Sequence, residues 1–149
     1  MLKPQDVFVA LKLLTLRSGR PAYSHIAYDL GMSPAEVHAA VQRAQRAQLL
    51  HGSEFAERPN ISTLEEFLIH GVKYAFPPDR GEPTRGIPTS YAAEPLKSLV
   101  RQGDELPPVW PYEKGTRRGI SFEPLYRTVP QVALRDKSLY EYLVLVDAL

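Results

Sequence analysis

Apolar residues recur every three or four positions in three successive segments near the start of the chain, 4–16, 23–30 and 34–50. This spacing places apolar side chains on one face of an α-helix, so each segment is predicted to be an amphipathic helix. The stripe of the first segment consists of Val7, Leu11 and Leu14. A loop, 17–21, separates the first two helices. We expect the three helices to pack together.

The second and third helices are separated by a very short connection, 31–33. Gly31 suits the end of a helix because glycine adopts a positive φ at little cost. Ser33 can accept a hydrogen bond as an N-cap, and Glu36 completes a capping box. Pro34 fits the first helical position, where its missing N–H is not needed. The sequence therefore predicts two helices joined by a tight turn.

This segment has a characteristic spacing of residue types. A small residue, a glycine and an aliphatic residue follow one another at Ala27, Gly31 and Val37, and Ile26 and Leu30 are apolar. It resembles the helix-turn-helix family of bacterial DNA-binding proteins, over about the first third of the chain. The opening segment is also similar to the first helix of winged-helix regulators. A DNA-reading head followed by a partner-facing half is similar in style to autoregulating antitoxins and defence-operon regulators. The resemblance implies a transcriptional regulator.

The outer face of the third helix carries side chains that can read DNA. Gln42 can pair with adenine, Arg43 or Arg46 with guanine or phosphate, and His38 with either. Small residues at the start of the helix allow close approach to a groove. Tyr23, Ser24, Ser33 and Arg46 are expected to hold phosphates. The residues expected to contact DNA are Tyr23, Ser24, Ser33, Pro34, Ala35, His38, Ala39, Gln42, Arg43, Arg46, Arg117 and Arg118. The alternative is a helical hairpin whose turn serves packing alone.

A winged domain would continue with a short hairpin bearing basic residues at its tip. The segment 51–60 contains Glu54 and Glu57, which would repel phosphate. The sequence leaves open whether this segment forms a wing. A further amphipathic helix, 61–76, is expected next, capped by its first serine or threonine and stopped by two prolines.

The composition changes after residue 76, where two proline-rich runs flank a predicted short helix, 91–100. Apolar residues between the prolines favour an extended wrap over a helical layer, with a docking surface for a partner or small ligand as the alternative. Alternating apolar residues predict a β-hairpin over 109–126. Its tip holds Arg117 and Arg118, which would act as a displaced wing or form a solvated turn.

The last segment, 128–149, is predicted to be helical. Apolar residues on nearly every face of its final helix indicate burial in its own core or in a dimer interface. We expect a mainly α fold with a small β-hairpin. It would comprise an N-terminal, winged helix-turn-helix domain, 1–76, and a mixed, proline-rich C-terminal region, 77–149, that ends in a helix.

Composition narrows the classes of function. The chain of 149 residues has 18 Lys and Arg against 17 Asp and Glu, a net charge of +1. No global cationic field therefore draws it to nucleic acid. The first 50 residues nevertheless carry six basic against three acidic residues, where the predicted motif would meet phosphate. The absence of cysteine excludes disulfides and thiolate metal sites.

The sequence contains no recognisable catalytic constellation. Gly81, Gly86 and Gly103 lie in proline-rich loops rather than between a strand and a helix, and the four histidines lack metal-ligand spacing. We therefore expect no enzymatic activity, no metal and no cofactor. The first residues lack a signal-peptide pattern, and no apolar run reaches membrane-spanning length. We expect a cytoplasmic protein that does not enter a membrane.

These patterns support one leading hypothesis and two alternatives. The first is a sequence-specific regulator that binds double-stranded DNA, as a homodimeric repressor that reads two half-sites. The second is a protein–protein adaptor, or an antitoxin-like protein, whose helix-turn-helix is a scaffold and whose C-terminal half binds a protein partner. The third is RNA binding through Arg117, Arg118 and nearby aromatic residues.

Overall fold

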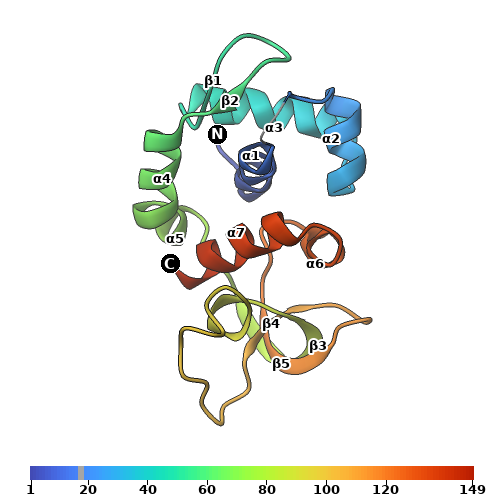
Figure 1. Cartoon of the computed structure of the whole chain (residues 1–149), viewed down its shortest axis with the longest axis vertical. Coiled ribbons are helices and arrows are strands. Elements are labelled where there is room, and N and C mark those ends of the chain that lie inside the picture. The colour runs from blue at the N-terminus through green and yellow to red at the C-terminus, as the bar shows by residue number, and fades with distance from the viewer. Residues whose placement is uncertain (17–18) are drawn as a thin grey trace. The chain divides into compact units, whose positions relative to one another are not determined.

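The computed structural model describes residues 1–16 and 19–149. Residues 17 and 18 of the predicted loop lie outside the described residues. Backbone contacts divide the chain into two units, Met1–Phe76 and Pro77–Leu149, and the helices and strands of each are labelled in Figure 1. The first unit is mainly helical, and the second combines a small mixed sheet with short helices.

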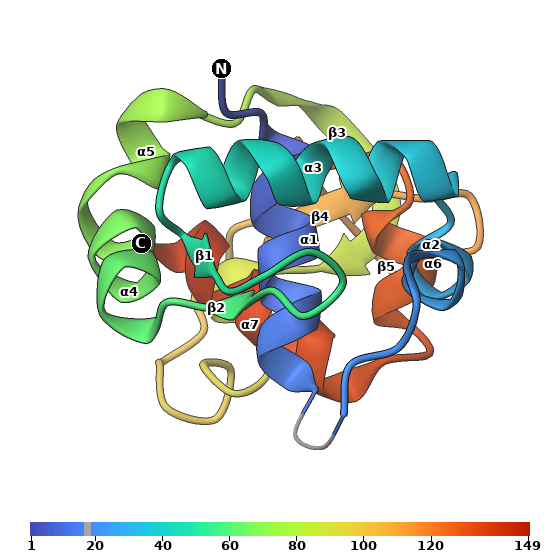
Figure 2. The same ribbon diagram turned by 90° about the horizontal axis from the view of Figure 1, so that it is seen from above.

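The first unit is built on α1 (Pro4–Thr15), α2 (Tyr23–Leu30) and α3 (Pro34–Arg46). Both α1 and α2 pack against α3, and Figure 2 shows α3 lying across α1. The buried faces follow the predicted apolar periodicity. Their fully buried members include Val7, Phe8, Leu11, Ile26, Leu30, Val37, Ala40, Val41 and Ala44. The three predicted helices are therefore confirmed.

The turn between α2 and α3 has the predicted chemistry. Gly31 adopts a left-handed conformation with φ of 64°, and the Met32 N–H donates to the Ala27 carbonyl at 2.9 Å. The Glu36 N–H donates to Ser33 Oγ at 3.1 Å, and the Ser33 N–H donates back to the Glu36 carboxylate at 3.2 Å. These bonds satisfy backbone donors that the start of a helix otherwise leaves unpaired.

Helix α3 ends at Arg46, four residues before the predicted end. Gln48 has φ of 66°, and this reversal turns Leu49 and Leu50 into the core, where each is 2% exposed. The chain then forms β1 (Leu50–His51), which pairs antiparallel with β2 (Arg58–Pro59). The segment 51–60, which the sequence left open, therefore lies in a short hairpin.

The predicted helix 61–76 is interrupted. It consists of α4 (Ile61–His70) and α5 (Val72–Ala75), with Gly71 between them. A Cβ atom on Gly71 would lie 2.5 Å from the Phe67 ring, so only glycine allows this close approach. The predicted serine or threonine cap is wrong, because Asn60 occupies the N-cap without a side-chain hydrogen bond.

The second unit contains three strands that close into a small barrel: β3 (Arg80–Pro88), β4 (Pro108–Pro111) and β5 (Arg117–Phe122). Strand β3 pairs antiparallel with both others, whereas β4 and β5 run parallel to each other. The predicted hairpin over 109–126 is therefore wrong. Alternation correctly indicated extended chain, but it carries no information on which strands pair.

The described helices of the second unit are short, except the last. The predicted helix 91–100 is replaced by a 3-10 turn, η1 (Ser90–Ala92), and irregular turns. Helices α6 (Val129–Ala133) and α7 (Lys137–Ala148) confirm the predicted helical end. Asp136 caps α7 by accepting a hydrogen bond from the Leu139 N–H at 3.1 Å.

A polar cluster joins α7 to the barrel. Asp147 Oδ2 accepts hydrogen bonds from Thr89 Oγ1 at 2.6 Å and from Trp110 Nε1 at 2.8 Å. The Tyr140 hydroxyl donates to the Pro88 carbonyl at 2.6 Å. Burial raises the pKa of Asp147 to about 7, although both hydrogen bonds favour the ionised form. Burial also raises the pKa of Tyr140 to about 12.

The raised pKa of Asp147 predicts a pH dependence of stability. The folded state holds a proton on Asp147 at pH values where the unfolded chain, with an ordinary pKa of 3.8, has lost it. The free energy of unfolding of the second unit should therefore fall as the pH rises from about 4 to about 7, then level off. The slope attributable to this group has an upper limit of roughly 1.4 kcal/mol per pH unit.

Urea denaturation followed by the fluorescence of Trp110, the single tryptophan, measures this slope. The Asp147→Asn variant keeps an acceptor for both donors but does not titrate. The free energy of unfolding of the natural protein minus that of the variant should decrease, or change sign, as the pH rises from about 4 to about 7. An identical pH dependence in both proteins would contradict the assignment to Asp147.

Candidate nucleic-acid interface

The outward face of α3 presents part of the predicted contact set to solvent. At its start, the exposed residues are Ser33, Pro34 and Ala35, and one turn further along Ala39 is partly exposed. Gln42 and Arg46 are exposed on the following turns. Ser24, at the start of α2, is also exposed. This face combines small side chains with an amide and a guanidinium.

Arg43 does not belong to that free face. Its guanidinium donates to the Asp6 carboxylate through two hydrogen bonds, from Nε at 2.8 Å and from Nη2 at 2.9 Å. Asp6 is fully buried and also accepts from the Lys3 N–H at 2.8 Å, as part of the capping box of α1. Donating these hydrogen bonds to Asp6 raises the pKa of Arg43. Arg43 therefore ties α3 to α1.

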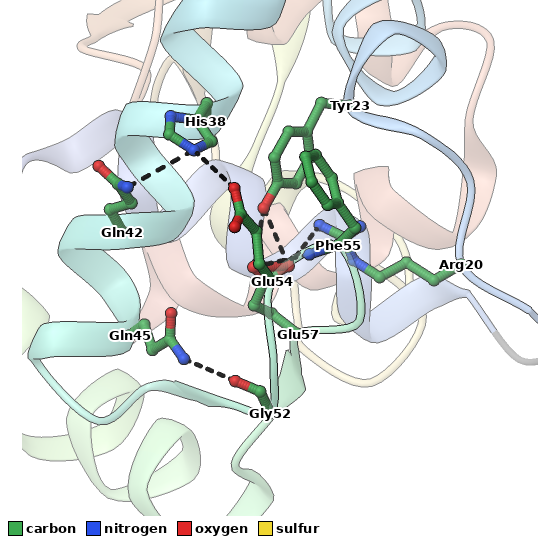
Figure 3. A network of polar contacts seen from close by, with 9 residues as sticks. All are labelled: Arg20, Tyr23, His38, Gln42, Gln45, Gly52, Glu54, Phe55 and Glu57. Carbon is green, nitrogen blue, oxygen red and sulfur yellow. Dashed lines mark hydrogen bonds and ion pairs between the residues drawn. The ribbon is translucent and has the colours of Figure 1, made fainter.

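Tyr23 likewise points into the protein rather than toward a phosphate. It is 7% exposed, and its hydroxyl donates to the Glu57 carboxylate, at 2.7 Å from one oxygen and 3.0 Å from the other. Its ring contacts those of His38 and Phe55, as Figure 3 shows. Burial, and then the hydrogen bond to Glu57, raise the pKa of Tyr23. Tyr23 holds the hairpin loop against α2 and α3.

The loop of the hairpin, 52–57, lies along α3. Gln45 Nε2 donates to the Gly52 carbonyl at 2.7 Å, and Nε2 of His38 lies 3.7 Å from a Glu54 oxygen (Figure 3). His38 also lies 3.5 Å from the Gln42 amide. The sequence predicts that His38 reads a base. In the structure its ring already contacts Tyr23 and Glu54.

The two glutamates of this loop, Glu54 and Glu57, which were expected to repel phosphate, differ in their burial. Glu57 is 3% exposed and pairs with Arg20 at 3.1 Å, so its charge is neutralised inside the unit. The Glu54 side chain is 66% exposed and remains a surface carboxylate beside His38. Any phosphate close to the hairpin loop would meet the charge of Glu54 alone.

Arg117 and Arg118 lie in β5 and not at the tip of a turn, so that part of the prediction is wrong. Both are exposed. In the pairing with β3, Arg118 is opposite Arg85 and Arg117 is opposite Gly86. Two arginines at one register position form a small cationic surface on the barrel, which belongs to the second unit.

Sequence reasoning missed the residues that position this site: Asp6, Arg20 and Glu57. Asp6 and Arg43 lie 37 positions apart, and Tyr23 and Glu57 lie 34 positions apart. No periodicity links such distant partners. A local signal was the charge of Asp6 directly beside the apolar residues 7–11, where an unpaired carboxylate would be costly.

Over residues 1–16 and 19–149, no group of three or more histidine or acidic side chains is arranged to hold a metal ion. In the same ranges, no helix combines the length and apolar character needed to cross a membrane. Comparisons of the chain with known protein families, with curated proteins and with solved structures give no match.

Proposed function

We propose that the Met1–Phe76 unit binds duplex DNA, with α3 entering the major groove. The observation that carries the proposal is the presentation of α3. A tight, capped turn fixes its start, its apolar face is buried on α1 and α2, and its outer face bears small residues, Gln42 and Arg46. This combination suits a recognition helix, because a groove admits a helix with small side chains at its leading end.

The contacts assigned to individual residues follow their exposure. Gln42 pairs with an adenine edge, and Arg46 reaches a guanine or a phosphate. Ser24 and Ser33 donate to phosphates, while Ala35 and Ala39 line the closest approach. Arg43 and Tyr23 act indirectly: they hold α3 and the hairpin in place through Asp6 and Glu57.

The helices and the following hairpin have the element order of a winged helix-turn-helix domain. In this proposal the hairpin is a wing whose loop supports α3 and does not contact phosphate, since Glu54 lies on its exposed side. A regulator of this kind acts as a symmetric dimer on two half-sites. We propose the same for this chain, as a homodimeric repressor.

Selection from pooled random duplex DNA tests the proposal. The full chain is immobilised, and the DNA retained at moderate and at high salt is sequenced. Enrichment of a palindrome, with retention that falls steeply with salt, would support a dimeric sequence-specific regulator and give its half-site spacing. Uniform, salt-insensitive recovery of all sequences would overturn it.

Two substitutions on the outer face should have different effects. Arg46→Ala is expected to weaken binding to all sequences and to lower the salt slope by about 1 if Arg46 contacts a phosphate. Gln42→Ala should relax the preference at one base pair and cost roughly 1–3 kcal/mol on the best site. Fluorescence anisotropy over a salt series measures both. Arg101→Ala, which removes an exposed arginine from the second unit, is the matched control.

A protein–protein adaptor is the second candidate. It is favoured by apolar side chains on the surface of the second unit: Leu99 is 79%, Leu106 is 45% and Val100 is 43% exposed. Binding of a protein through such a surface would persist at high salt, whereas binding to several phosphates would not. The salt series therefore separates the two candidates.

A further inference from the structure

The first unit contains a cavity that the proposed DNA interface does not use. Its volume is about 180 Å³. The apolar part of its wall consists of Leu13 and Leu14 of α1, Leu16 directly after it, Pro59 of β2 and Ile61 of α4. An apolar cavity of roughly 150 Å³ accommodates a benzene ring. The space therefore suits a ligand with one small apolar body.

Arg20 lines this cavity and has unused hydrogen-bonding capacity. Its side chain is 5% exposed, and its guanidinium lies 4.7 Å from the centroid of the Tyr23 ring. Nη2 lies 3.1 Å from a Glu57 oxygen, which neutralises the charge. This contact is an ion pair and not a hydrogen bond. Within residues 1–16 and 19–149, none of Nε, Nη1 and Nη2 has a hydrogen-bond acceptor. Buried donors of a guanidinium are normally paired.

Glu57 is engaged by other donors. Its carboxylate accepts from the Tyr23 hydroxyl and, at 3.2 Å, from the Phe55 N–H, and Figure 3 shows these bonds beside Arg20. The ion pair thus orients Arg20 without using its N–H groups. An acceptor from outside the protein would complete the coordination of the guanidinium.

The charges around the cavity select the kind of acceptor. Arg20 and Arg58 contribute two positive charges to the lining, and Glu57 contributes one negative charge, which leaves a net charge of +1. A single carboxylate balances this charge, and its two oxygens match the geometry of a guanidinium. A dianion would leave an excess negative charge among these residues.

We propose that this cavity binds a small organic monocarboxylate with an apolar body of about six or seven carbon atoms. The carboxylate accepts hydrogen bonds from Arg20, and the apolar body lies against the leucines of α1 and against Pro59 and Ile61. The site lies on the side of the unit formed by α1, β2 and α4, and its occupancy does not depend on whether α3 binds DNA.

Benzoate tests the proposal, with benzamide as its neutral counterpart of the same shape. Titration of the full chain, followed by two-dimensional amide NMR, should give saturable shifts for residues at the end of α1 and in β2. A dissociation constant on the order of 1 mM is expected for a ligand of this size. Benzamide should bind about tenfold more weakly, because it lacks the charge that pairs with the guanidinium. Equal binding of the two, or no saturation by benzoate, would overturn the proposal.

Two variants locate the site. Arg20→Lys keeps the charge but loses the planar donors, and should weaken benzoate binding about tenfold. Leu16→Trp places an indole in the wall, leaves the ion pair intact and should abolish binding. Arg101→Lys, in the second unit, should change nothing. Circular dichroism verifies folding, and if Arg20→Lys fails to fold, unchanged benzoate binding by folded Leu16→Trp still refutes the proposed cavity.

Discussion

Replacement of Arg43 by alanine is expected to lower the free energy of unfolding of the first unit by about 3 kcal/mol. The Asp6 carboxylate that Arg43 pairs with is 0% exposed, while the Arg43 side chain is 22% exposed. Removing the guanidinium would leave a buried carboxylate that the Lys3 N–H, a neutral donor, does not neutralise. Leaving a buried charge without its partner costs more free energy than the ion pair contributes to stability. The expected effect of the substitution is therefore large.

Urea denaturation followed by far-ultraviolet circular dichroism measures this loss. Arg46→Ala is the matched control, because it removes the same side chain from the same helix at an exposed position and should change stability by less than about 0.5 kcal/mol. Asp6→Asn in the Arg43→Ala background removes the stranded charge and should recover part of the loss. Equal stabilities of Arg43→Ala and Arg46→Ala would refute the structural role of Arg43.

The same experiment bears on the DNA-binding assay. The sequence suggested Arg43 as a reader of guanine, so its loss would have been interpreted as a lost base contact. With Arg43 bound to Asp6, a weakened complex would instead follow from misplacement of α3 on α1. Stability and DNA affinity should therefore fall together in Arg43→Ala, whereas only affinity should fall in Arg46→Ala.

Replacement of Gly86 by alanine is expected to destabilise the second unit by at least about 3 kcal/mol, or to prevent its folding. A Cβ atom at this position would lie 2.0 Å from the Trp110 carbonyl oxygen and 2.7 Å from its carbonyl carbon. These are backbone atoms of the neighbouring strand, and they cannot move without breaking the pairing of β3 with β4. The barrel would have to open at that point.

The fluorescence of Trp110 reports this change directly, because Trp110 is 1% exposed in the folded unit. Gly103→Ala is the matched control: nothing lies within 4 Å of the Cβ position there, and its φ is not in the left-handed range. That substitution should be neutral, or stabilising by up to about 1 kcal/mol, because it restricts the unfolded chain. A Gly86→Ala protein with unaltered unfolding would contradict the described strand pairing.

The hairpin of the first unit shows where sequence reasoning reaches its limit. The segment 51–60 has no alternation long enough to predict strands, and its two glutamates suggested a poor wing. In the structure each strand has two residues, and the loop is held by contacts with side chains of α2 and α3. Glu57, interpreted as a surface charge, is the buried acceptor for Tyr23.

The features that can be predicted from the sequence are those whose causes are local. Apolar spacing defined α1, α2, α3 and α7, and the residues from Gly31 to Glu36 specified the turn and its caps, because each bond there joins groups only a few positions apart. The same periodicity placed Ala35, Gln42 and Arg46 on the outward face of α3.

Contacts between distant groups could not be predicted in this way, because they arise from tertiary packing. The closure of β3, β4 and β5 into a barrel depends on pairing between residues far apart along the chain. So do the removal of Arg43 and Tyr23 from the exposed surface and the placement of Arg20 beside a cavity. A charged side chain has the same local signature whether it faces solvent or a buried partner, and the free energy of desolvation that separates these cases is set by packing.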